Sequence, residues 1–304
     1  MKKIIDKITE YNKIIIIMHI RPDGDCYGSG FGLKQSILDN FPKKEVYVLG
    51  EQLENKSHIG ITDTLEDKDF KGALVISLDT GTRSRIYDKR FNEGDYLIRI
   101  DHHVHVDFFG DIDYVDTSSP ATSYIIASLL MKYDLNISKK TAECLYTGIV
   151  TDTGRFRFRG VNGDTHRVIA QLVSTGIDQQ YLLGKLYERS LNEIQFEGEL
   201  LNRIQTDGSI IYLKIPRSLI TKYNLSDPVV AEFISILEDI KNFPIWVLFY
   251  ETDSNIRCRI RSKDFQVDKI ANKFNGGGHK HASGATCYSW EETDQLIAEL
   301  KKGY

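Results

Sequence analysis

Short apolar runs alternate with amphipathic segments along the first half of the chain. Four runs of strand length lie at residues 13–19, 44–50, 73–79 and 95–101, and helical patterns such as residues 29–41 lie between some of them. Apolar runs of this length that alternate with helical patterns indicate parallel strands joined by crossover helices. We therefore predict an α/β fold with a parallel sheet in the first half of the chain.

After about residue 110 the pattern becomes mainly helical. In the segment 119–133, Ser119 is placed to cap a helix and Pro120 to begin it. Further along, the run 155-RFRFRG-160 alternates arginine with phenylalanine. This alternation is typical of a half-buried strand with its rings inward. The alternative is that an arginine of this run reaches a phosphate while a ring meets a nucleobase.

Strand-like runs return at residues 210–215, 245–251 and 255–262, with a helical pattern at 228–240 between the first two. The end of the chain reads as a helix, a glycine-rich turn, a strand and a helix. Before these runs, the polar stretch 188–205 has a helical pattern but no obvious apolar face. We expect this stretch to bridge two domains.

The length of 304 residues favours two domains, since single cores rarely extend beyond about 250–300 residues. We place a first domain at residues 1–185, a helical linker at 186–205 and a smaller second domain at 206–304. The composition, 41% apolar and 27% charged, is ordinary for a globular protein. A net charge of −4 gives no general reason to bind long nucleic acid, so we expect no duplex DNA partner. A homodimer is left open.

The amino-terminal segment 1-MKKIIDKITEYNK-13 mixes lysines and isoleucines with acidic residues, so we expect no signal peptide. No apolar run approaches the ~20 residues of a membrane span, and no membrane partner is expected. The four cysteines, Cys26, Cys144, Cys258 and Cys287, are scattered and form no Cys-x-x-Cys pair. This spacing favours reduced thiols in a cytoplasmic protein over a zinc knuckle.

Carboxylates follow three of the predicted strands at their carboxyl ends. The segment 19-HIRPDGDCYGSG-30 follows the first run, Asp79 ends the third, and 101-DHH-103 ends the fourth. Because the carboxyl ends of parallel strands meet at one edge of a sheet, we expect these groups to converge. A further aspartate, Asp152, closes the apolar run that begins at Gly148.

Divalent cations are the simplest way to neutralise these carboxylates, which would otherwise repel by about 4 kcal/mol per pair at an effective dielectric near 20. Oxygen ligands with a few imidazoles suit Mn²⁺, Mg²⁺ or Fe²⁺ better than structural zinc. Six candidate ligands exceed one coordination shell with open positions, so we infer two ions, as in hydrolases that clamp a phosphate. Each aspartate alone has the simpler explanation of a turn residue or helix N-cap, but three clusters together favour metal.

These residues resemble the four motifs of DHH phosphoesterases, namely 19-HIRPDGDCYGS-29, Asp79, 101-DHH-103 and Asp152. The segment 276-GGGHKHASG-284, preceded by 259-RIRSK-263, is similar to the DHHA1 substrate-binding subdomain. The resemblance implies a DHH domain with a parallel sheet flanked by helices. It also implies a helical linker and a smaller α/β DHHA1 domain with a mixed sheet.

The resemblance implies two Mn²⁺ ions, for which Mg²⁺ or other divalent cations could substitute. The implied ligands of one ion are His19, Asp23 and Asp79. Those of the other are Asp25, Asp79, His102 and Asp152, so that Asp79 bridges both.

The remaining residues of the motifs are implied to act on the substrate. The second histidine of the signature, His103, would face the scissile phosphate as an electrostatic stabiliser or general acid. Asp101 would orient the first histidine, His102. The implied substrate contacts in the second domain are Arg261, Ser262, Gly276, Gly277, Gly278 and His279, and the alternating arginines of 255–263 add Arg257.

A chain of this length that contains both a DHH and a DHHA1 part resembles the stand-alone oligoribonucleases and pAp phosphatases, including enzymes that cleave linear di-adenylate. This implies Mn²⁺-dependent hydrolysis of RNA of about two to five nucleotides, of pApA or of pAp by metal-activated water. The alternatives are a member similar to inorganic pyrophosphatases or single-strand exonucleases, and a nucleotide-binding module without activity. The sequence does not rank the substrates.

Overall fold

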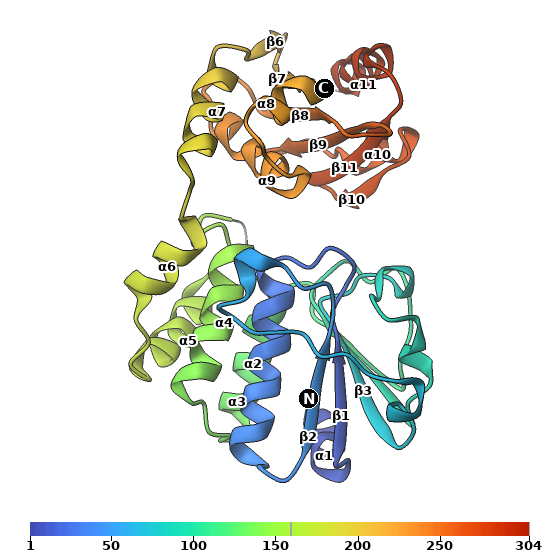
Figure 1. Ribbon diagram of the computed structural model, residues 1–304, viewed down its shortest axis with the longest axis vertical. Helices are drawn as coiled ribbons and strands as arrows, with labels where there is room; N and C mark the ends of the chain where they lie inside the picture. Colours follow the sequence, from blue (N-terminus) through green and yellow to red (C-terminus); the bar gives the residue numbers. More distant parts are fainter. Residues whose placement is uncertain (159, 304) are drawn as a thin grey trace. The chain divides into compact units, whose positions relative to one another are not determined.

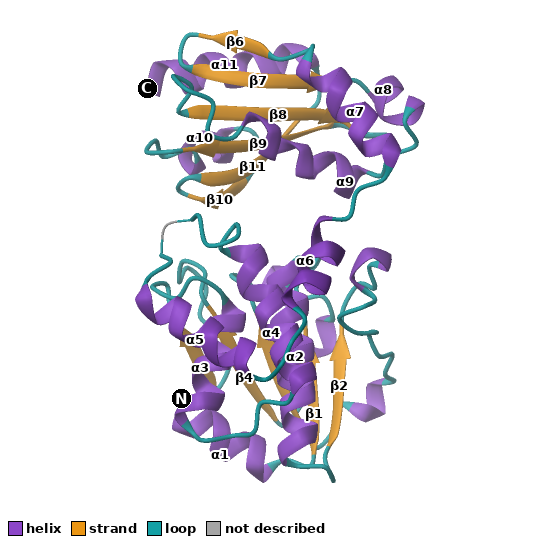
Figure 2. Cartoon of the chain, turned by 90° about the vertical axis from the view of Figure 1, so that its left-hand side faces the viewer, coloured by secondary structure: helices purple, strands orange, loops and turns teal. Residues whose placement is uncertain are grey.

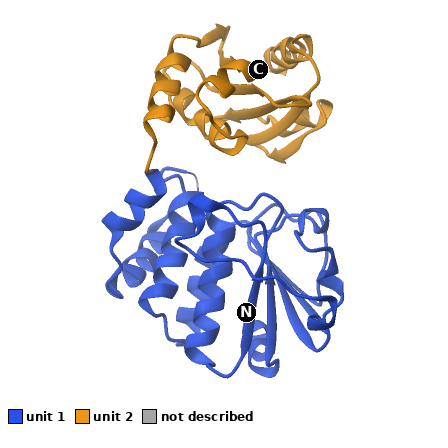
Figure 3. Cartoon of the chain, in the orientation of Figure 1, with its two compact units in different colours: residues 1–187 blue, residues 188–304 orange. Residues whose placement is uncertain are grey.

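The computed structural model describes residues 1–158 and 160–303, which divide into two compact units, residues 1–187 and 188–304 (Figure 3). Within the described residues, none of the helices combines the length and the apolar character needed to cross a membrane. Each unit has its own sheet and its own hydrophobic core.

The first unit contains a five-stranded sheet in the order β2-β1-β3-β4-β5, in which every neighbouring pair is parallel (Figure 1). The parallel sheet predicted for the first half of the chain is therefore confirmed. The strands are β1 (Lys13–Ile17), β2 (Glu45–Leu49), β3 (Ala73–Leu78), β4 (Tyr96–Asp101) and β5 (Ile112–Val115). The helices are α1 (Lys2–Glu10), α2 (Gly24–Asn40), α3 (Thr122–Lys132), α4 (Lys139–Asp152), α5 (Gly163–Ser174) and α6 (Gln179–Tyr187).

The two faces of this sheet are buried in different ways. In β1, Ile14 and Ile16 face the larger core that is shared with α2, α3 and α4, while Ile15 and Ile17 face a smaller core. The larger core explains why the α-helices gather on one side of the sheet in Figure 2. The smaller core is closed by connecting segments that supply Phe70, Ile86, Phe91 and Phe109. Burial on both faces explains the unbroken apolar runs of the central strands.

Helices α2 and α4 pack with their backbones almost in contact. A Cβ atom added to Gly28 would lie 2.6 Å from the carbonyl oxygen of Cys144 and 2.7 Å from the Cα of Gly148. Only glycine permits this approach, because real Cβ atoms do not come so near to backbone atoms. The contact matters for the site described below, since α2 begins at its aspartates and α4 ends at Asp152.

The second unit contains a six-stranded sheet in the order β10-β11-β9-β8-β7-β6. The pair β7–β8 is parallel and the other pairs are antiparallel, so the predicted mixed sheet is confirmed. The strands are β6 (Gln205–Asp207), β7 (Ile210–Ile215), β8 (Ile245–Glu251), β9 (Ile256–Ser262), β10 (Gly277–His279) and β11 (Ala282–Cys287). The helices are α7 (Leu191–Leu201), α8 (Arg217–Lys222), α9 (Asp227–Glu232), α10 (Asp268–Lys273) and α11 (Trp290–Gly303).

Several local expectations differ from the structure. Helix α3 starts at Thr122 with Ala121 as its N-cap, so Ser119 and Pro120 lie outside it. The stretch expected to lack an apolar face contains α7, whose Phe196 and Leu200 are buried in the second unit. The predicted helix at 228–240 is short, because α9 gives way to the 3₁₀ turn η5 (Phe233–Leu237).

The arginine–phenylalanine run does not form a strand in its described part. After α4 the chain turns, and Arg155 and Phe156 have left-handed backbone angles, with φ of 60° and 66°. Left-handed residues cannot continue a strand, so the alternation of the sequence has no counterpart here. The last arginine of the run, Arg159, lies outside the described residues.

Candidate catalytic and metal-binding site

The predicted site residues of the first half come together at the carboxyl edge of the parallel sheet. His19 follows β1, Asp79 follows β3, and His102 follows β4, and these three strands are adjacent in the sheet. Asp25 lies in the first turn of α2 and Asp152 at the last residue of α4. The topology therefore brings together groups that are up to 133 positions apart in the chain.

Asp79 occupies the centre of this cluster and is only 2% exposed. One carboxylate oxygen lies 3.6 Å from His19 Nε2, and the other lies 3.6 Å from His102 Nε2. The second oxygen also accepts a hydrogen bond of 3.0 Å from the hydroxyl of Thr122. The backbone of Asp79 is left-handed, with φ of 54°, which turns the chain sharply at the end of β3. Asp79 thus faces two histidines that follow different strands, β1 and β4.

Asp25, His102 and Asp152 form a second group whose ligand atoms lie within 4.8 Å of one another. Asp25 is 1% exposed and accepts hydrogen bonds from the backbone amides of Thr122, at 2.6 Å, and Ser123, at 2.9 Å. These amides begin α3, where unpaired N–H groups favour a negative charge. His102 Nε2 lies 3.2 Å from Asp152 Oδ2. The group combines two carboxylates and one imidazole, a set that suits a divalent cation.

The group around His19 differs from the expected ligand set. His19 Nε2 lies 4.0 Å from Asp23 Oδ1, but that oxygen caps α2 by accepting from the amides of Asp25 and Cys26. The compact group on this side consists of His19, Asp79 and the buried thiol of Cys26. Burial raises the pKa of Cys26 to about 11, so the thiol stays protonated near neutral pH. An oxygen ligand to a cation on this side would therefore come from Asp79 or Asp23.

Asp101 contacts a different histidine from the one we expected. Its Oδ1 lies 2.7 Å from Nδ1 of His103 and also accepts from the backbone amides of His102 and His103. The ring of His102 instead has its Nδ1 3.2 Å from the carbonyl oxygen of Ser119. The chain bends at His103, just after β4, and the ring of this second histidine contacts Asp101. Asp101 thus orients His103.

A fully buried arginine holds Asp101 in turn. Nη2 of Arg99 donates to Asp101 Oδ2 at 2.6 Å and to the carbonyl oxygen of Gly81 at 3.0 Å, while Nη1 donates to the carbonyl oxygen of Asp107 at 2.6 Å. Burial acts to raise the pKa of Asp101, but hydrogen bonds from His103 and Arg99 outweigh it and hold the pKa below its usual range. Asp101 therefore stays ionised against the His103 ring.

Without a bound cation, the buried carboxylates of the cluster shift the pKa values of one another and of the neighbouring histidine. Burial and the nearby charge of Asp79 raise the pKa of Asp25 to about 7. Burial raises the pKa of Asp152 well above its usual value, and the charge of Asp25 adds to this. Burial lowers the pKa of His102, but the charges of Asp152 and Asp79 outweigh this and raise it to about 9. Buried carboxylates that lie close together and have raised pKa values are expected in a site that binds cations.

In the second unit, the predicted substrate contacts lie on β9, on β10 and at Gly276, just before β10. Arg257 and Arg261 are partly exposed on β9, whereas Ser262 is buried and its hydroxyl donates to the carbonyl oxygen of Phe265. The glycine-rich segment is a strand edge and not a plain turn, because Gly277, Gly278 and His279 pair with β11. Gly276 packs directly on β11, since an added Cβ would lie 2.6 Å from the Cα of Ala285.

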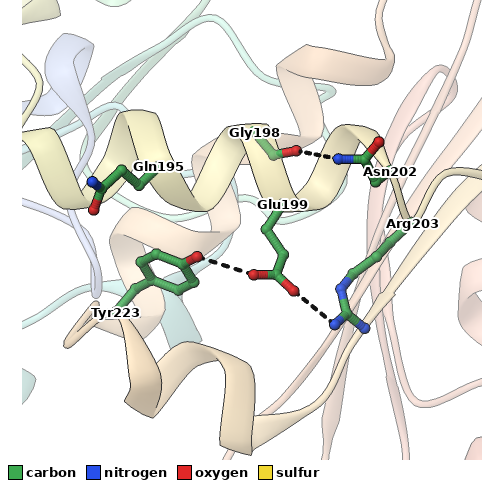
Figure 4. Close-up of a pocket in the computed structure, with 6 residues that line it drawn as sticks. All are labelled: Gln195, Gly198, Glu199, Asn202, Arg203 and Tyr223. Atoms are coloured by element: carbon green, nitrogen blue, oxygen red, sulfur yellow. Dashed lines mark hydrogen bonds and ion pairs between the residues drawn. The ribbon is translucent and has the colours of Figure 1, made fainter.

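A hollow of about 510 Å³ in the second unit is lined by α7, the turn after it and the end of α8, and contains none of the predicted site residues (Figure 4). Its polar groups bond to one another. The carboxylate of Glu199 accepts from Arg203 at 2.8 Å and from the Tyr223 hydroxyl at 3.0 Å. The hollow therefore offers few unsatisfied groups to a ligand.

Sequence reasoning missed three residues of this site. Thr122 and Arg99 had no motif to reveal them, although a single arginine within the apolar run 95–101 is an unusual feature. Cys26 lies inside the first motif, but only the structure shows that its thiol shares a group with His19 and Asp79.

Comparison with known proteins gives matches along the whole chain. Residues 13–149 match the DHH family, N-terminal domain, and residues 207–303 match the DHHA1 domain. The bifunctional oligoribonuclease and PAP phosphatase NrnA of Bacillus subtilis is 34% identical, over 98% of this chain and 97% of the relative. A probable bifunctional oligoribonuclease and PAP phosphatase NrnA of Streptococcus mutans is 35% identical, over 99% of this chain and 97% of the relative. The crystal structure of an exopolyphosphatase-related protein from Bacteroides fragilis has a TM-score of 0.90 at 27% identity, over 99% and 95% of the two chains.

Proposed function

The chain belongs to the DHH family and is a hydrolase that acts on phosphoester bonds, and from this premise we propose that it cleaves short oligoribonucleotides, linear dinucleotides such as pApA, and pAp, with two Mn²⁺ ions. The printed names of the relatives support oligoribonucleotides and pAp as substrate classes. Four free, buried cysteines support a reducing compartment, the cytoplasm.

The observation that carries this proposal is the convergence of Asp25, Asp79, His102 and Asp152 from four separate segments. Two of these carboxylates, Asp25 and Asp79, are almost completely buried, and the first has its pKa raised to about 7. Buried carboxylates packed this closely fit a site that divalent cations neutralise. We assign His19, Asp23 and Asp79 to one cation and Asp25, Asp79, His102 and Asp152 to the other.

When bound, two divalent cations supply positive charge for the phosphate and lower the pKa of water. Within this frame His103 has a distinct role. Its Nδ1 is engaged with Asp101 at 2.7 Å, so the ring can take up or release a proton only at Nε2. Burial lowers the pKa of His103, but the hydrogen bond with Asp101 and the charge of Asp79 outweigh this and raise it. A protonated ring of this kind would stabilise negative charge on the phosphate and protonate a leaving oxygen.

The test is release of nucleotide from pApA, pAp and a 5′-phosphorylated RNA pentamer, measured with Mn²⁺ and with a chelator. We expect turnover of the three substrates with Mn²⁺ only. Asp79→Ala should abolish turnover and reduce bound Mn²⁺, because this carboxylate faces both histidines. Asp164→Ala, an exposed aspartate paired with Arg167 on α5, is the matched control and should behave as wild type.

Two outcomes would reject the proposal. Binding of pApA without release of mononucleotide would indicate a nucleotide-binding module. Hydrolysis of inorganic pyrophosphate alone would indicate a pyrophosphatase-like member of the family. Two Mn²⁺ ions per chain and full activity in Asp79→Ala would contradict the assignment of this residue.

A further inference from the structure

One of the groups that could hold a cation contains a sulfur atom. One ligand atom from each of His19, Cys26 and Asp79 lies within 4.8 Å of the other two, and all three residues are buried. We call this group the His19 site. The neighbouring group, which we call the Asp25 site, consists of Asp25, His102 and Asp152. It offers nitrogen and oxygen donors only, so two cations at this edge of the sheet would meet different sets of donors.

His19 presents one ring nitrogen to its site. Its Nδ1 lies 3.0 Å from the carbonyl oxygen of Ile20, and a hydrogen bond between these atoms needs a proton on Nδ1. The neutral ring then has its lone pair on Nε2, which lies 3.6 Å from Asp79 Oδ2. A tetrahedral zinc site spaces its nitrogen, oxygen and sulfur donors by roughly 3.3–3.7 Å. These two donors therefore already have the spacing of ligands that share a cation.

The start of α2 holds the thiol of Cys26 in place. Oδ1 of Asp23 accepts a hydrogen bond from the amide of Cys26, which lies in the first turn of the helix. Helical side chains tilt toward the N-terminus of their helix, and the sulfur of Cys26 accepts a hydrogen bond of 3.4 Å from the backbone amide of His19. The residue is completely buried, so the sulfur faces the site and not the solvent.

The surroundings of this sulfur suit a thiolate that is bound to a cation. Without a cation, burial holds the pKa of the thiol well above neutral pH. A coordinating cation deprotonates a thiol, and both the amide donor and the N-terminal end of α2 favour the negative charge that results. Binding therefore breaks the S–H bond, forms a bond between sulfur and metal, and releases the proton to water.

The carboxylate that was expected to complete this site is engaged elsewhere. Asp23 Oδ1 lies 4.0 Å from His19 Nε2 and caps α2, and the side chain of Asp23 is 60% exposed. Asp23 thus has to change its contacts before it can bind a cation through this oxygen. The sulfur of Cys26 needs a shift on the order of 1 Å to reach the spacing of a tetrahedral site.

We propose that Cys26 is a ligand of the cation in the His19 site and makes this site prefer the thiophilic cations Zn²⁺ and Co²⁺ over Mn²⁺. Thiolate ligands select softer cations, whereas carboxylate and water suit Mn²⁺. The inference deepens the proposed function, because it names the metal preference of one of the two cation sites. With Mn²⁺ alone, both sites hold Mn²⁺. When Zn²⁺ is also present, the His19 site exchanges its ion before the Asp25 site does.

The first experiment titrates the metal-free full chain with Co²⁺ and records its ultraviolet absorption. A thiolate bound to Co²⁺ gives an intense charge-transfer band in the near ultraviolet, which nitrogen and oxygen ligands do not give. The wild type should develop this band as its first cation site fills. Absence of the band in the wild type would overturn the inference without the use of any variant.

Variants then assign the band to one thiol. Cys26→Ala should lose it, and so should Cys26→Ser, which keeps the volume of the side chain but offers a weaker hydroxyl donor. Cys144→Ala removes the other buried thiol of the first unit and should keep the band. Cys258→Ala should also keep it, although the sulfur atoms of Cys258 and Cys287 lie 3.5 Å apart in the second unit. A band that survives in Cys26→Ala would overturn the inference.

A second measurement compares the affinities for Zn²⁺ and Mn²⁺ by calorimetric titration. Most sites bind Zn²⁺ more tightly than Mn²⁺, so the informative quantity is the change in the ratio of the two Kd values. Cys26→Ala should raise the Kd of Zn²⁺ by more than the roughly 10–100-fold that follows the loss of a group that only orients a ligand. The Kd of Mn²⁺ should rise by less than about threefold. Equal rises for both cations would show that Cys26 only supports the site, and would reject the inference.

The failure of the proposed function would look different. A wild-type chain that releases nucleotide with Mn²⁺ but gives no thiolate band with Co²⁺ would reject Cys26 as a ligand and keep the hydrolysis. A chain whose band is lost in Cys26→Ala, but which releases no nucleotide from any of the three substrates, would reject the hydrolysis and keep the ligand.

Discussion

The contact between α2 and α4 can be tested with two glycines of the same helix. Gly28 faces the backbone of α4, where an added Cβ would lie 2.6 Å from the carbonyl oxygen of Cys144. Gly30 lies two positions further on, and its nearest neighbours, the side chains of Met18 and Val48, are 3.7 Å away. The substitutions Gly28→Ala and Gly30→Ala therefore add the same methyl group to a forbidden position and to a permitted one.

The structure gives the two substitutions opposite signs. Contacts between a Cβ and backbone atoms below 3.0 Å require the helices to separate, and such overpacking costs about 1–3 kcal/mol. At Gly30 the methyl group fits, so the lower entropy of the unfolded chain should stabilise by about 0.5–1 kcal/mol. The free energies of unfolding of the two variants should thus differ by roughly 1.5–4 kcal/mol. Gly28→Ala should also weaken Mn²⁺ binding, since α2 carries Asp25 and α4 carries Asp152.

Urea unfolding followed by far-UV circular dichroism measures the stability, and calorimetric titration with Mn²⁺ measures metal binding. Both tryptophans of the chain, Trp246 and Trp290, belong to the second unit, so their fluorescence reports that unit and serves as an internal control. Equal stability of the two variants, or unchanged Mn²⁺ affinity in a destabilised Gly28→Ala, would refute the argument that this contact sets the distance between the ligands.

Three further outcomes follow from the site. On the proposed mechanism, His103→Ala should bind as much Mn²⁺ as wild type while kcat falls by about 10²–10⁴, because its ring contacts Asp101 and would act on the substrate. Loss of metal would show that His103 is a ligand. Arg99→Leu should lower the free energy of unfolding by about 3–5 kcal/mol, because it leaves the buried carboxylate of Asp101 without the guanidinium group that it pairs with. The control Arg83→Leu, which breaks an exposed ion pair with Asp107, should cost less than about 1 kcal/mol. Equal losses of the two variants in urea unfolding would contradict this. Folding raises the pKa of Asp25 to about 7, so the contribution of this residue to the stability of the metal-free protein falls as the pH rises from about 4 to 7. Mn²⁺ should therefore raise Tm more at pH 8 than at pH 6, and scanning calorimetry measures this difference.

The strands and the convergence of the carboxylates could be predicted because they depend on local rules. Four apolar runs of strand length identify the sheet, and the common edge of parallel strands then brings Asp79 and the residues after β1 and β4 together. The same rules explain the mixed sheet less directly, since the parallel pairing of β7 with β8 depends on the chain between them.

Other features could not be predicted, because they depend on contacts between distant segments. Arg99 is buried since its donors meet the carbonyl oxygens of Gly81 and Asp107, which no local pattern reveals. The partner of Asp101 depends on the path of the chain after β4, and both histidines of the pair are equally near in sequence. The prediction of Ser119 as the N-cap of α3 was wrong for a similar reason. The hydroxyl of Ser119 donates to Asp116 instead, and its carbonyl oxygen faces the ring of His102.

The left-handed backbone of Asp79 limits how this enzyme can change over evolutionary time. Apart from glycine, asparagine and aspartate are the residues that most readily adopt such a conformation, whereas a longer acid such as glutamate enters it at a cost. Codons for asparagine and glycine are each one nucleotide change from those for aspartate, and both residues would keep the turn while removing the charge. A lineage released from selection for hydrolysis could therefore lose its metals here without losing its fold. Asparagine or glycine at this position is the expected mark of a descendant that still binds nucleotides but no longer cleaves them.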